Sequence, residues 1–169
     1  PDVISMSDHP AMAVRAKPDS SMVVAMGLVR DGQADAFVSA GNSGGVLATA
    51  LLSRSRLGRV KGIRRPAIST VLPTRTGKSF ILDIGANTDC KPDWLFQFAH
   101  MGSIYAECVL GIPSPRVALL SNGEEDTKGN ETVIAAHELL KGSNLNFIGN
   151  VEGKNILTGY ADVIIADGF

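Results

Sequence analysis

The stretch Ser79-Phe-Ile-Leu-Asp-Ile-Gly-Ala-Asn-Thr-Asp-Cys-Lys-Pro92 contains the pattern that decides the fold of this chain. Its first part, through Ile84, is rich in β-forming apolar residues and predicts a buried strand. A small, polar, glycine-containing loop follows, and Pro92 predicts the first turn of a helix that continues toward Leu110. Strand, polar loop and helix in this order are the repeating unit of α/β proteins.

The same order recurs along the chain. Further apolar runs predict strands at residues 35–39, 67–72, 116–121, 146–149 and 162–166, and helical patterns cover 22–29, 46–52 and 130–140. The linker 73–78 is short enough for a hairpin, which predicts one antiparallel pair. Apolar strands flanked by helices on both sides indicate a mostly parallel sheet that is buried on both faces. We therefore predict a single α/β domain over residues 1–169, with a mixed, mostly parallel sheet.

The composition excludes several classes of protein. A net charge of −1 gives no basic surface for nucleic acid, so we expect no nucleic-acid partner. No apolar run approaches the ~20 residues of a transmembrane helix. Cys90 and Cys108 have no CxxC spacing, which argues against a disulfide framework or a zinc site and favours the cytoplasm. Because the chain starts with Pro1 and stops directly after an apolar run, we expect it to be a piece of a longer chain.

Small, polar, glycine-containing stretches follow four of the predicted strands. They are residues 40–45, 85–92, 122–131 and 167–168. In open α/β sheets, ligands bind beyond the carboxyl ends of the strands, where helix N-termini present free N–H groups. We therefore expect the four loops to converge on one crevice.

The loop Gly41-Asn-Ser-Gly-Gly45 has two readings. Three glycines suggest that the backbone comes close to an anion, because no Cβ blocks the approach. The alternative is a tight turn in which Ser43 caps the following helix. The loop matches neither GxGxxG nor GxxxxGK[ST], which argues against a dinucleotide site or a P-loop.

Other side chains with chemical potential each have a structural explanation. Asp83, Asp89 and Asp167 could hold a divalent metal, but aspartates at strand ends cap helices more often, so we predict no metal. Cys90 is expected to be a bystander thiol. His100 is expected to be packed, His9 and His137 to lie at the surface, and Trp94, Phe98 and Tyr105 to belong to the core.

Seven ordered motifs together resemble one family. They are residues 35–44, 61–67, 82–92, 97–103, 123–131, 146–153 and 162–169. In these motifs the chain resembles the middle section of the PlsX-type phosphate acyltransferases of bacterial phospholipid synthesis, whose chains are about twice as long. The segment before these motifs in that family, and the Thr-Gly-Asn that follows Asp-Gly-Phe, lie outside this sequence.

The resemblance implies a reaction, a fold and partners. The reaction is acyl-[acyl-carrier-protein] plus inorganic phosphate giving acyl phosphate and free carrier protein, without a cofactor. The fold is a three-layer α/β sandwich related to isocitrate dehydrogenases and phosphotransacetylases. The partners are acyl carrier protein, a second copy in a homodimer, and a membrane glycerol-3-phosphate acyltransferase that receives the product during peripheral membrane association.

The resemblance also suggests roles for individual residues. Lys128 matches a catalytic lysine of the family, whose partner asparagine would lie in the Thr-Gly-Asn beyond Phe169. Phosphate attack on a thioester builds negative charge on the carbonyl oxygen, and Asn42, Asn87 and Lys128 are candidate donors to it. For phosphate or substrate binding we expect Gly41, Ser43, Gly44, Gly45, Asp83, Asp89, Lys91, Asn130, Glu131 and Asp167. Ser43, where the family pattern has Thr, and Ser121-Asn122 depart from that pattern.

Two other functions fit the same sequence. The first is a short-chain phosphotransacetylase acting on acyl-CoA, because it shares the fold and the phosphate chemistry. The second is a non-catalytic fragment that binds the carrier protein or forms the dimer, in which case the chain by itself would be inactive.

Overall fold

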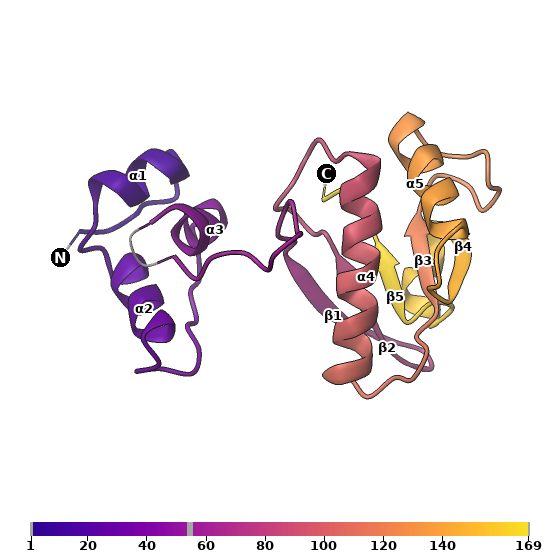
Figure 1. Cartoon of the computed structure of the whole chain (residues 1–169), viewed down its shortest axis with the longest axis horizontal. Coiled ribbons are helices and arrows are strands. Elements are labelled where there is room, and N and C mark those ends of the chain that lie inside the picture. Colours follow the sequence, from indigo (N-terminus) through magenta and orange to yellow (C-terminus); the bar gives the residue numbers. More distant parts are fainter. Residues whose placement is uncertain (1, 54–55, 169) are drawn as a thin grey trace. The chain divides into compact units, whose positions relative to one another are not determined.

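The computed structural model describes residues 2–53 and 56–168. Its contacts gather into two compact units, Pro1–Ile63 and Arg64–Phe169, where the sequence predicted one domain (Figure 1). Each unit has its own hydrophobic cluster and is described by itself.

The described residues of the first unit form three helices, α1 (Pro10–Ala16), α2 (Ser21–Arg30) and α3 (Ser43–Leu52). They enclose a small core formed by Ile4, Ala13, Val14, Met22, Val23 and Ala48. The patterns of α2 and α3 were predicted, whereas α1 was missed because it has only 7 residues. It begins with a proline in the first turn, where a missing N–H costs no hydrogen bond.

The strand predicted at residues 35–39 is wrong. This segment has no regular secondary structure and belongs to no sheet, and Val38 is 92% exposed. A run of five residues shows a preference for extended backbone, but a strand also needs a neighbour that accepts and donates its hydrogen bonds. The first unit, as far as the structure describes it, supplies no such neighbour.

The second unit contains a five-stranded sheet in the order β1-β2-β5-β3-β4. The strands are β1 (Ser69–Thr74), β2 (Gly77–Leu82), β3 (Val117–Leu120), β4 (Phe147–Val151) and β5 (Val163–Ile165). The β1–β2 pair is an antiparallel hairpin, and the other neighbours are parallel. The predicted α/β class, the mixed and mostly parallel sheet, and the single hairpin are confirmed.

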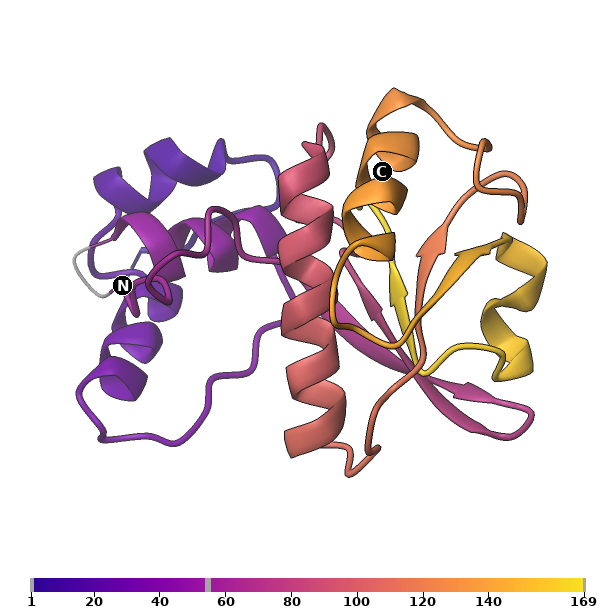
Figure 2. The same ribbon diagram turned by 45° about the vertical axis from the view of Figure 1, so that its right-hand side comes forward.

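Alternate residues of the central strands face opposite sides of this sheet. Leu82, Leu119 and Ile165 pack under α4 (Pro92–Cys108) and α5 (Glu131–Lys141), which cover one face. Ile81, Ala118 and Ile164 form the opposite face, where Ile156 of the 3₁₀ helix η1 (Gly153–Thr158) packs against them. Figure 2 shows α4 and η1 on either side of the strands. Burial on both faces explains why the strands read as continuous apolar runs.

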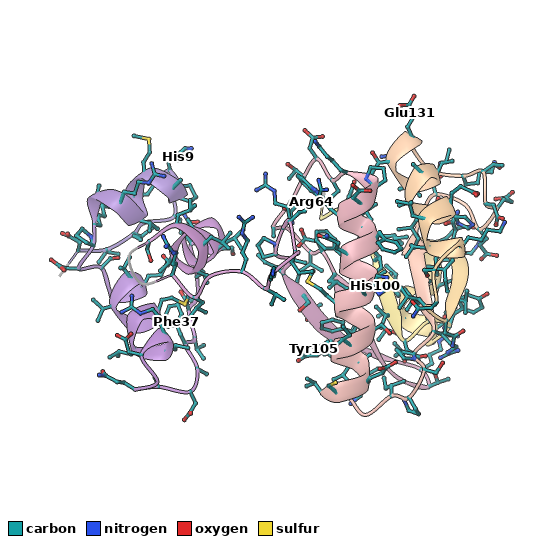
Figure 3. All side chains as sticks on the ribbon, in the orientation of Figure 1. His9, Phe37, Arg64, His100, Tyr105 and Glu131 are labelled. Atoms are coloured by element: carbon teal, nitrogen blue, oxygen red, sulfur yellow. The ribbon has the colours of Figure 1, made fainter. Side chains whose placement is uncertain are left out.

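Several side chains of the second unit lie where the sequence did not place them. His137 is 2% exposed and not at the surface, because Asn150 of β4 bonds its ring. Phe98 is fully buried as predicted, but Tyr105 is 38% exposed and stacks on Phe80 with ring centroids 4.3 Å apart. Figure 3 shows His100 and Tyr105 on α4. Helical spacing selects the face of a helix but does not reveal a polar partner on a distant strand.

Candidate active site

A crevice lies at the carboxyl ends of the parallel strands, where the predicted polar loops of the second unit meet. One cavity of about 300 Å³ is lined by Thr88, Asp89, Cys90, Asn130, Thr132 and Asp167. These residues come from the loops after β2 and β5 and from the start of α5, which follows β3. A neighbouring cavity of about 270 Å³ shares Thr88 and Asp89 with the first and adds Arg65, Ala86, Asn87 and Trp94. Three of the four predicted loops therefore converge in this unit.

Asp83 organises the loop after β2. Its side chain is 1% exposed, and Oδ1 accepts hydrogen bonds from the backbone N–H groups of Ile68, Gly85 and Ala86. Oδ2 accepts from both the backbone N–H and the side-chain Nδ2 of Asn87, at 2.8 and 2.7 Å. Four of these five hydrogen bonds come from the loop itself, and the fifth comes from Ile68, just before β1. These bonds show that Asp83 shapes the loop after β2. Its role as a substrate ligand stays a prediction.

Asn87 is held in place by the same arrangement. Its Nδ2 donates to Asp83 and also to the carbonyl oxygen of Pro66, at 2.9 Å. Both amide hydrogens are therefore engaged. The side chain is 8% exposed, so Asn87 fixes the loop between β2 and α4 in this conformation.

Gly168 joins the loop after β5 to the loop after β2. Its φ is +81°, and a Cβ at this position would lie 2.5 Å from the carbonyl oxygen of Asn87 and 2.9 Å from Oδ2 of Asp83. Only glycine allows this close approach. The close packing of these two loops therefore requires glycine at position 168.

Lys128 lies on the exposed loop between β3 and α5, two residues before Asn130 of the cavity wall. Of the residues that the structure describes, none receives a hydrogen bond or ion pair from its ammonium group. The carboxylate of Glu124, which is close to Lys128 in the sequence, accepts a hydrogen bond from Asn155. Lys128 therefore has three donors available for a ligand.

The other predicted residues of this unit lie around the crevice in different ways. Asp89 and Asp167 line the cavity, and Asn130 caps α5, with Oδ1 accepting from the N–H of Val133 at 2.9 Å. Lys91 occupies the N-cap position of α4 and is exposed. Glu131 is exposed at the start of α5 and points outward (Figure 3).

Cys90 has the environment of an unreactive thiol. It is half-buried, and Sγ lies 3.4 Å from the carbonyl oxygen of Asp167, to which it donates. Burial, followed by the nearby carboxylates of Asp83 and Asp167, raises the pKa of Cys90 to about 11. Since the thiolate is the nucleophilic form, this thiol is nearly all neutral at physiological pH.

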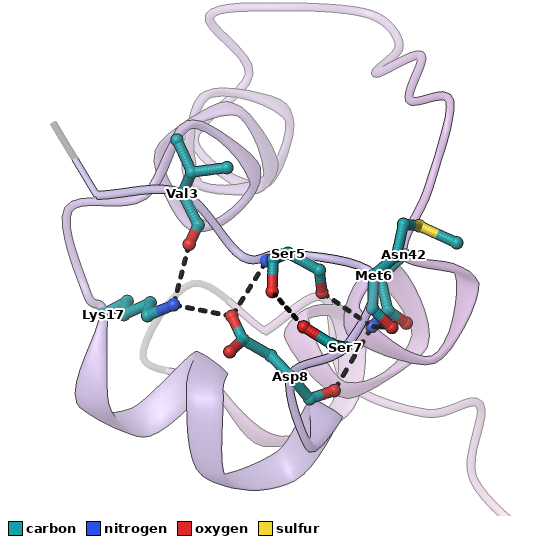
Figure 4. Close-up of polar contacts among 7 residues, drawn as sticks. All are labelled: Val3, Ser5, Met6, Ser7, Asp8, Lys17 and Asn42. Atoms are coloured by element: carbon teal, nitrogen blue, oxygen red, sulfur yellow. Dashed lines mark hydrogen bonds and ion pairs between the residues drawn. The ribbon is translucent and has the colours of Figure 1, made fainter.

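The glycine loop belongs to the first unit, where Asn42 caps α3. The side chain of Asn42 also bonds the N-terminal segment (Figure 4). Oδ1 of Asn42 accepts from the N–H of Gly45 at 3.1 Å, and Nδ2 donates to the carbonyl oxygen of Ser5 at 3.1 Å. The alternative reading was thus wrong in one detail: the cap is Asn42, and Ser43 is the first helical residue. The amide connects α3 to the N-terminal segment.

The glycines of this loop have close neighbours. A Cβ on Gly44 would lie 2.7 Å from Cγ of Pro10, and a Cβ on Gly45 would lie 3.2 Å from Sδ of Met22. Gly41 has a φ of +131°, which side chains rarely adopt. Packing within the first unit therefore accounts for the glycines. Their contact with phosphate stays a prediction.

Comparison with known proteins places the chain in a family. The model of the family described as "Fatty acid synthesis protein" matches residues 1–169. The chain belongs to this family. It is 57% identical over 168 residues to the phosphate acyltransferase of Heliobacterium modesticaldum, a match that covers 99% of this chain and 49% of that protein.

Further relatives agree with the family resemblance seen in the motifs. The phosphate acyltransferase of Pelotomaculum thermopropionicum is 55% identical over 169 residues, with 100% of this chain and 48% of that protein covered. That of Trichodesmium erythraeum is 53% identical over 171 residues, with 99% and 49% covered. The predicted family is confirmed, and the chain spans about half the length of the curated relatives it matches.

One further crevice residue of this family member was not selected from the sequence. Arg65 lines the smaller cavity, and its guanidinium lies 4.8 Å from the ring centroid of Trp94. Stacking of this kind orients the planar group and leaves its N–H donors accessible at the edge. Arg64 and Arg65 lie together in one of the family motifs, and the sequence alone does not distinguish between them.

Two kinds of feature are absent from the described part of the chain. Within residues 2–53 and 56–168, no helix is both long enough and apolar enough to cross a membrane. The same residues contain no group of three or more histidine, cysteine or acidic side chains arranged for a metal ion.

Proposed function

We propose that this chain forms part of a phosphate acyltransferase, which transfers a fatty acyl group from acyl-[acyl-carrier-protein] to inorganic phosphate. The observation that carries the proposal is the unpaired Lys128 beside a polar crevice at the carboxyl edge of the sheet, in a chain whose relatives are named phosphate acyltransferases. The product, acyl phosphate, would serve phospholipid synthesis.

The proposed chemistry needs binding and charge stabilisation more than a protein nucleophile. A phosphate oxygen attacks the thioester carbon, the tetrahedral intermediate collapses, and the carrier thiol leaves with a proton taken from phosphate. Lys128 and Arg65 would supply positive charge near Asp89 and Asp167, whose carboxylates alone would repel phosphate. Because phosphate is itself the nucleophile, the neutral Cys90 fits a structural role and no cofactor is required.

Among the candidate donors to the developing oxyanion, Lys128 is preferred. The side-chain hydrogens of Asn87 are engaged by Asp83 and Pro66, and Nδ2 of Asn42 donates to Ser5. An oxyanion donor must be free to bond the oxygen in the transition state. We therefore assign the main catalytic charge to Lys128, and to Asn87 and Asn42 a contribution that would require their present bonds to break.

The wider partners of the proposal rest on family membership. They are acyl carrier protein as donor, a homodimer, and peripheral membrane association in the cytoplasm with a glycerol-3-phosphate acyltransferase as acceptor of the product. Within the second unit, Lys91, Asn130 and Glu131 stay candidates for phosphate binding. The glycine loop of the first unit, Gly41, Ser43, Gly44 and Gly45, is a separate candidate.

The direct test is an activity assay on a version with the full length of the relatives. Acyl-[acyl-carrier-protein] and phosphate should give acyl phosphate, trapped as the hydroxamate, in amounts equal to the free carrier protein released. A preference for acyl-CoA would indicate a phosphotransacetylase. Binding of carrier protein without any acyl phosphate would contradict an enzymatic role.

A further inference from the structure

A buried histidine connects α5, β4 and the loop that carries Lys128. His137 of α5 is 2% exposed, and its Nδ1 lies 2.9 Å from Oδ1 of Asn150 on β4, which is 4% exposed. Its Nε2 faces Oδ1 of Asp126 in the loop, at 3.4 Å. The proposed chemistry does not use this ring, yet both of its nitrogens have partners.

The bonds of Asn150 fix the proton on Nδ1. Nδ2 of Asn150 donates to the carbonyl oxygen of Glu125 at 2.9 Å, so the amide cannot be turned over without losing this bond. Oδ1 of Asn150 can only accept, and Nδ1 of His137 must therefore donate to it. The neutral ring is then the tautomer with a bare Nε2.

The second nitrogen makes the contact with Asp126 dependent on a proton. In the neutral ring, the lone pair of Nε2 would face the carboxylate of Asp126, and two acceptors repel each other. Protonated His137 donates from Nδ1 to Asn150 and from Nε2 to Asp126. The arrangement around the ring is thus complementary to the imidazolium form.

The charges around His137 come from the loop and from its own helix. Lys141 donates to Asp126 at 2.8 Å, and this bond, followed by the charges of His137 and Lys141, lowers the pKa of Asp126. The pKa of Lys141 is raised mainly by its hydrogen bond to Asp126, and the negative charge of Glu138 on the same helix raises it further. β4 contributes Asn150 and the edge-on ring of Phe147, 5.1 Å away, and α4 meets α5 through the apolar core.

The same bonds lead to Lys128. The carbonyl oxygen of Glu125, which accepts from Asn150, also accepts from the backbone N–H of Lys128 at 3.0 Å. The stem of Lys128 lies against Gly123, where a Cβ would come within 2.6 Å of its Cγ. Asn150 therefore holds one side of the turn, and Asp126 holds the other.

We propose that His137 is a positioning residue for Lys128: in its protonated form it bonds both Asn150 and Asp126 and so fixes the loop in its working conformation. The proposal rests on the catalytic role given to Lys128. When His137 loses its proton, the contact with Asp126 is lost, the loop loosens and Lys128 is less well placed. Turnover should then be higher at pH values where His137 is protonated than at values where it is neutral.

The test compares kcat against pH for three variants of the full-length version. His137→Gln should lower kcat about 10- to 100-fold with KM nearly unchanged, because misplacement of a catalytic group costs transition-state stabilisation. Asp126→Asn should abolish the fall in kcat at higher pH, because the amide introduced by this change can donate to the neutral ring and still accept from Lys141. His100→Gln, on α4 and outside this network, is the control and should keep the wild-type profile.

A second measurement separates this proposal from the proposed function. Hydrogen exchange at the backbone N–H of Lys128 should show more protection in Asp126→Asn than in wild type at pH 8, and no more than wild type at pH 5. Asp126 is more than half exposed, so this variant should fold even if His137→Gln does not. If protection follows this pattern while no acyl phosphate is made, the proposed function is wrong and the positioning link stands. If Asp126→Asn keeps both the wild-type pH profile and the wild-type protection, the positioning role is overturned.

Discussion

Asn42, Asn87 and Lys128 carry comparable polar groups in the sequence, but the structure gives them different surroundings. Asn42 caps α3 and bonds the N-terminal segment, while Asn87 bonds Asp83 and Pro66. Lys128 is exposed, and no described residue pairs with its ammonium group. Residue type and spacing identified all three as candidates. Only the hydrogen-bond partners, which come from distant segments, distinguish a structural amide from an available donor.

At the residue scale, Lys128→Ala tests the proposed role of Lys128 as the main donor to the oxyanion. We expect kcat to fall about 10²- to 10³-fold, the range for loss of one donor to an oxyanion, with a smaller change in KM. Steady-state kinetics of the full-length version would measure both constants. Lys154→Ala, an exposed lysine on η1 paired with Glu152, is the matched control and should keep normal kinetics. If Lys128→Ala folds normally and keeps a near-normal kcat, the catalytic role is contradicted and Lys128 is a solvated surface charge.

The raised pKa of Cys90 gives a prediction about its reactivity with pH. Alkylation by iodoacetamide requires the thiolate, which the fold disfavours up to about pH 11. The rate of modification of the Cys90 peptide, followed by mass spectrometry, should rise throughout pH 8–10 without reaching a plateau. Unfolding in denaturant should remove this protection. A plateau at or below pH 8 in the folded protein would show an activated thiol and would support a nucleophilic role for Cys90.

At the scale of elements, the sequence predicted where strands, loops and helices begin and end better than it predicted which strands pair. The stretch from Ser79 to Pro92 gave β2, its polar loop and the start of α4 within two residues of their observed bounds. Local preference is enough there, because an apolar run, a glycine and a proline act within a few residues. Residues 35–39 carry a similar preference but have no partner strand, and α1 is too short to show a periodic pattern.

The glycine loop offers an element-scale test that separates packing from phosphate binding. Gly44→Ala should destabilise the first unit, because its Cβ would lie 2.7 Å from Cγ of Pro10. Adding Pro10→Ala removes that atom and should restore most of the lost stability, as measured by denaturant unfolding. If the loop binds phosphate, the KM for phosphate should stay raised in the double variant while that for carrier protein does not. If the double variant recovers its stability and both KM values are normal, Gly44 has a packing role alone.

At the scale of the whole chain, the order of the strands in the sheet could not be predicted from the sequence. β5 is last in the chain but lies between β2 and β3, and this position brings Asp167 and Gly168 against the loop after β2. Convergence of the loops could be predicted because parallel strands end at one edge of a sheet. Which loops become neighbours depends on the pairing of strands far apart in sequence, and that pairing is decided by the packing of both faces.

The central claim is that phosphate attacks the thioester directly, with Lys128 assisting and no acylated side chain. The most direct measurement is a single turnover of the full-length version with excess enzyme and acyl-[acyl-carrier-protein], first without phosphate and then with it. We predict no release of free carrier protein until phosphate is added, followed by release in step with acyl phosphate formation. Stoichiometric release of carrier protein in the absence of phosphate, with the acyl group recovered on Cys90 or another side chain, would contradict the account.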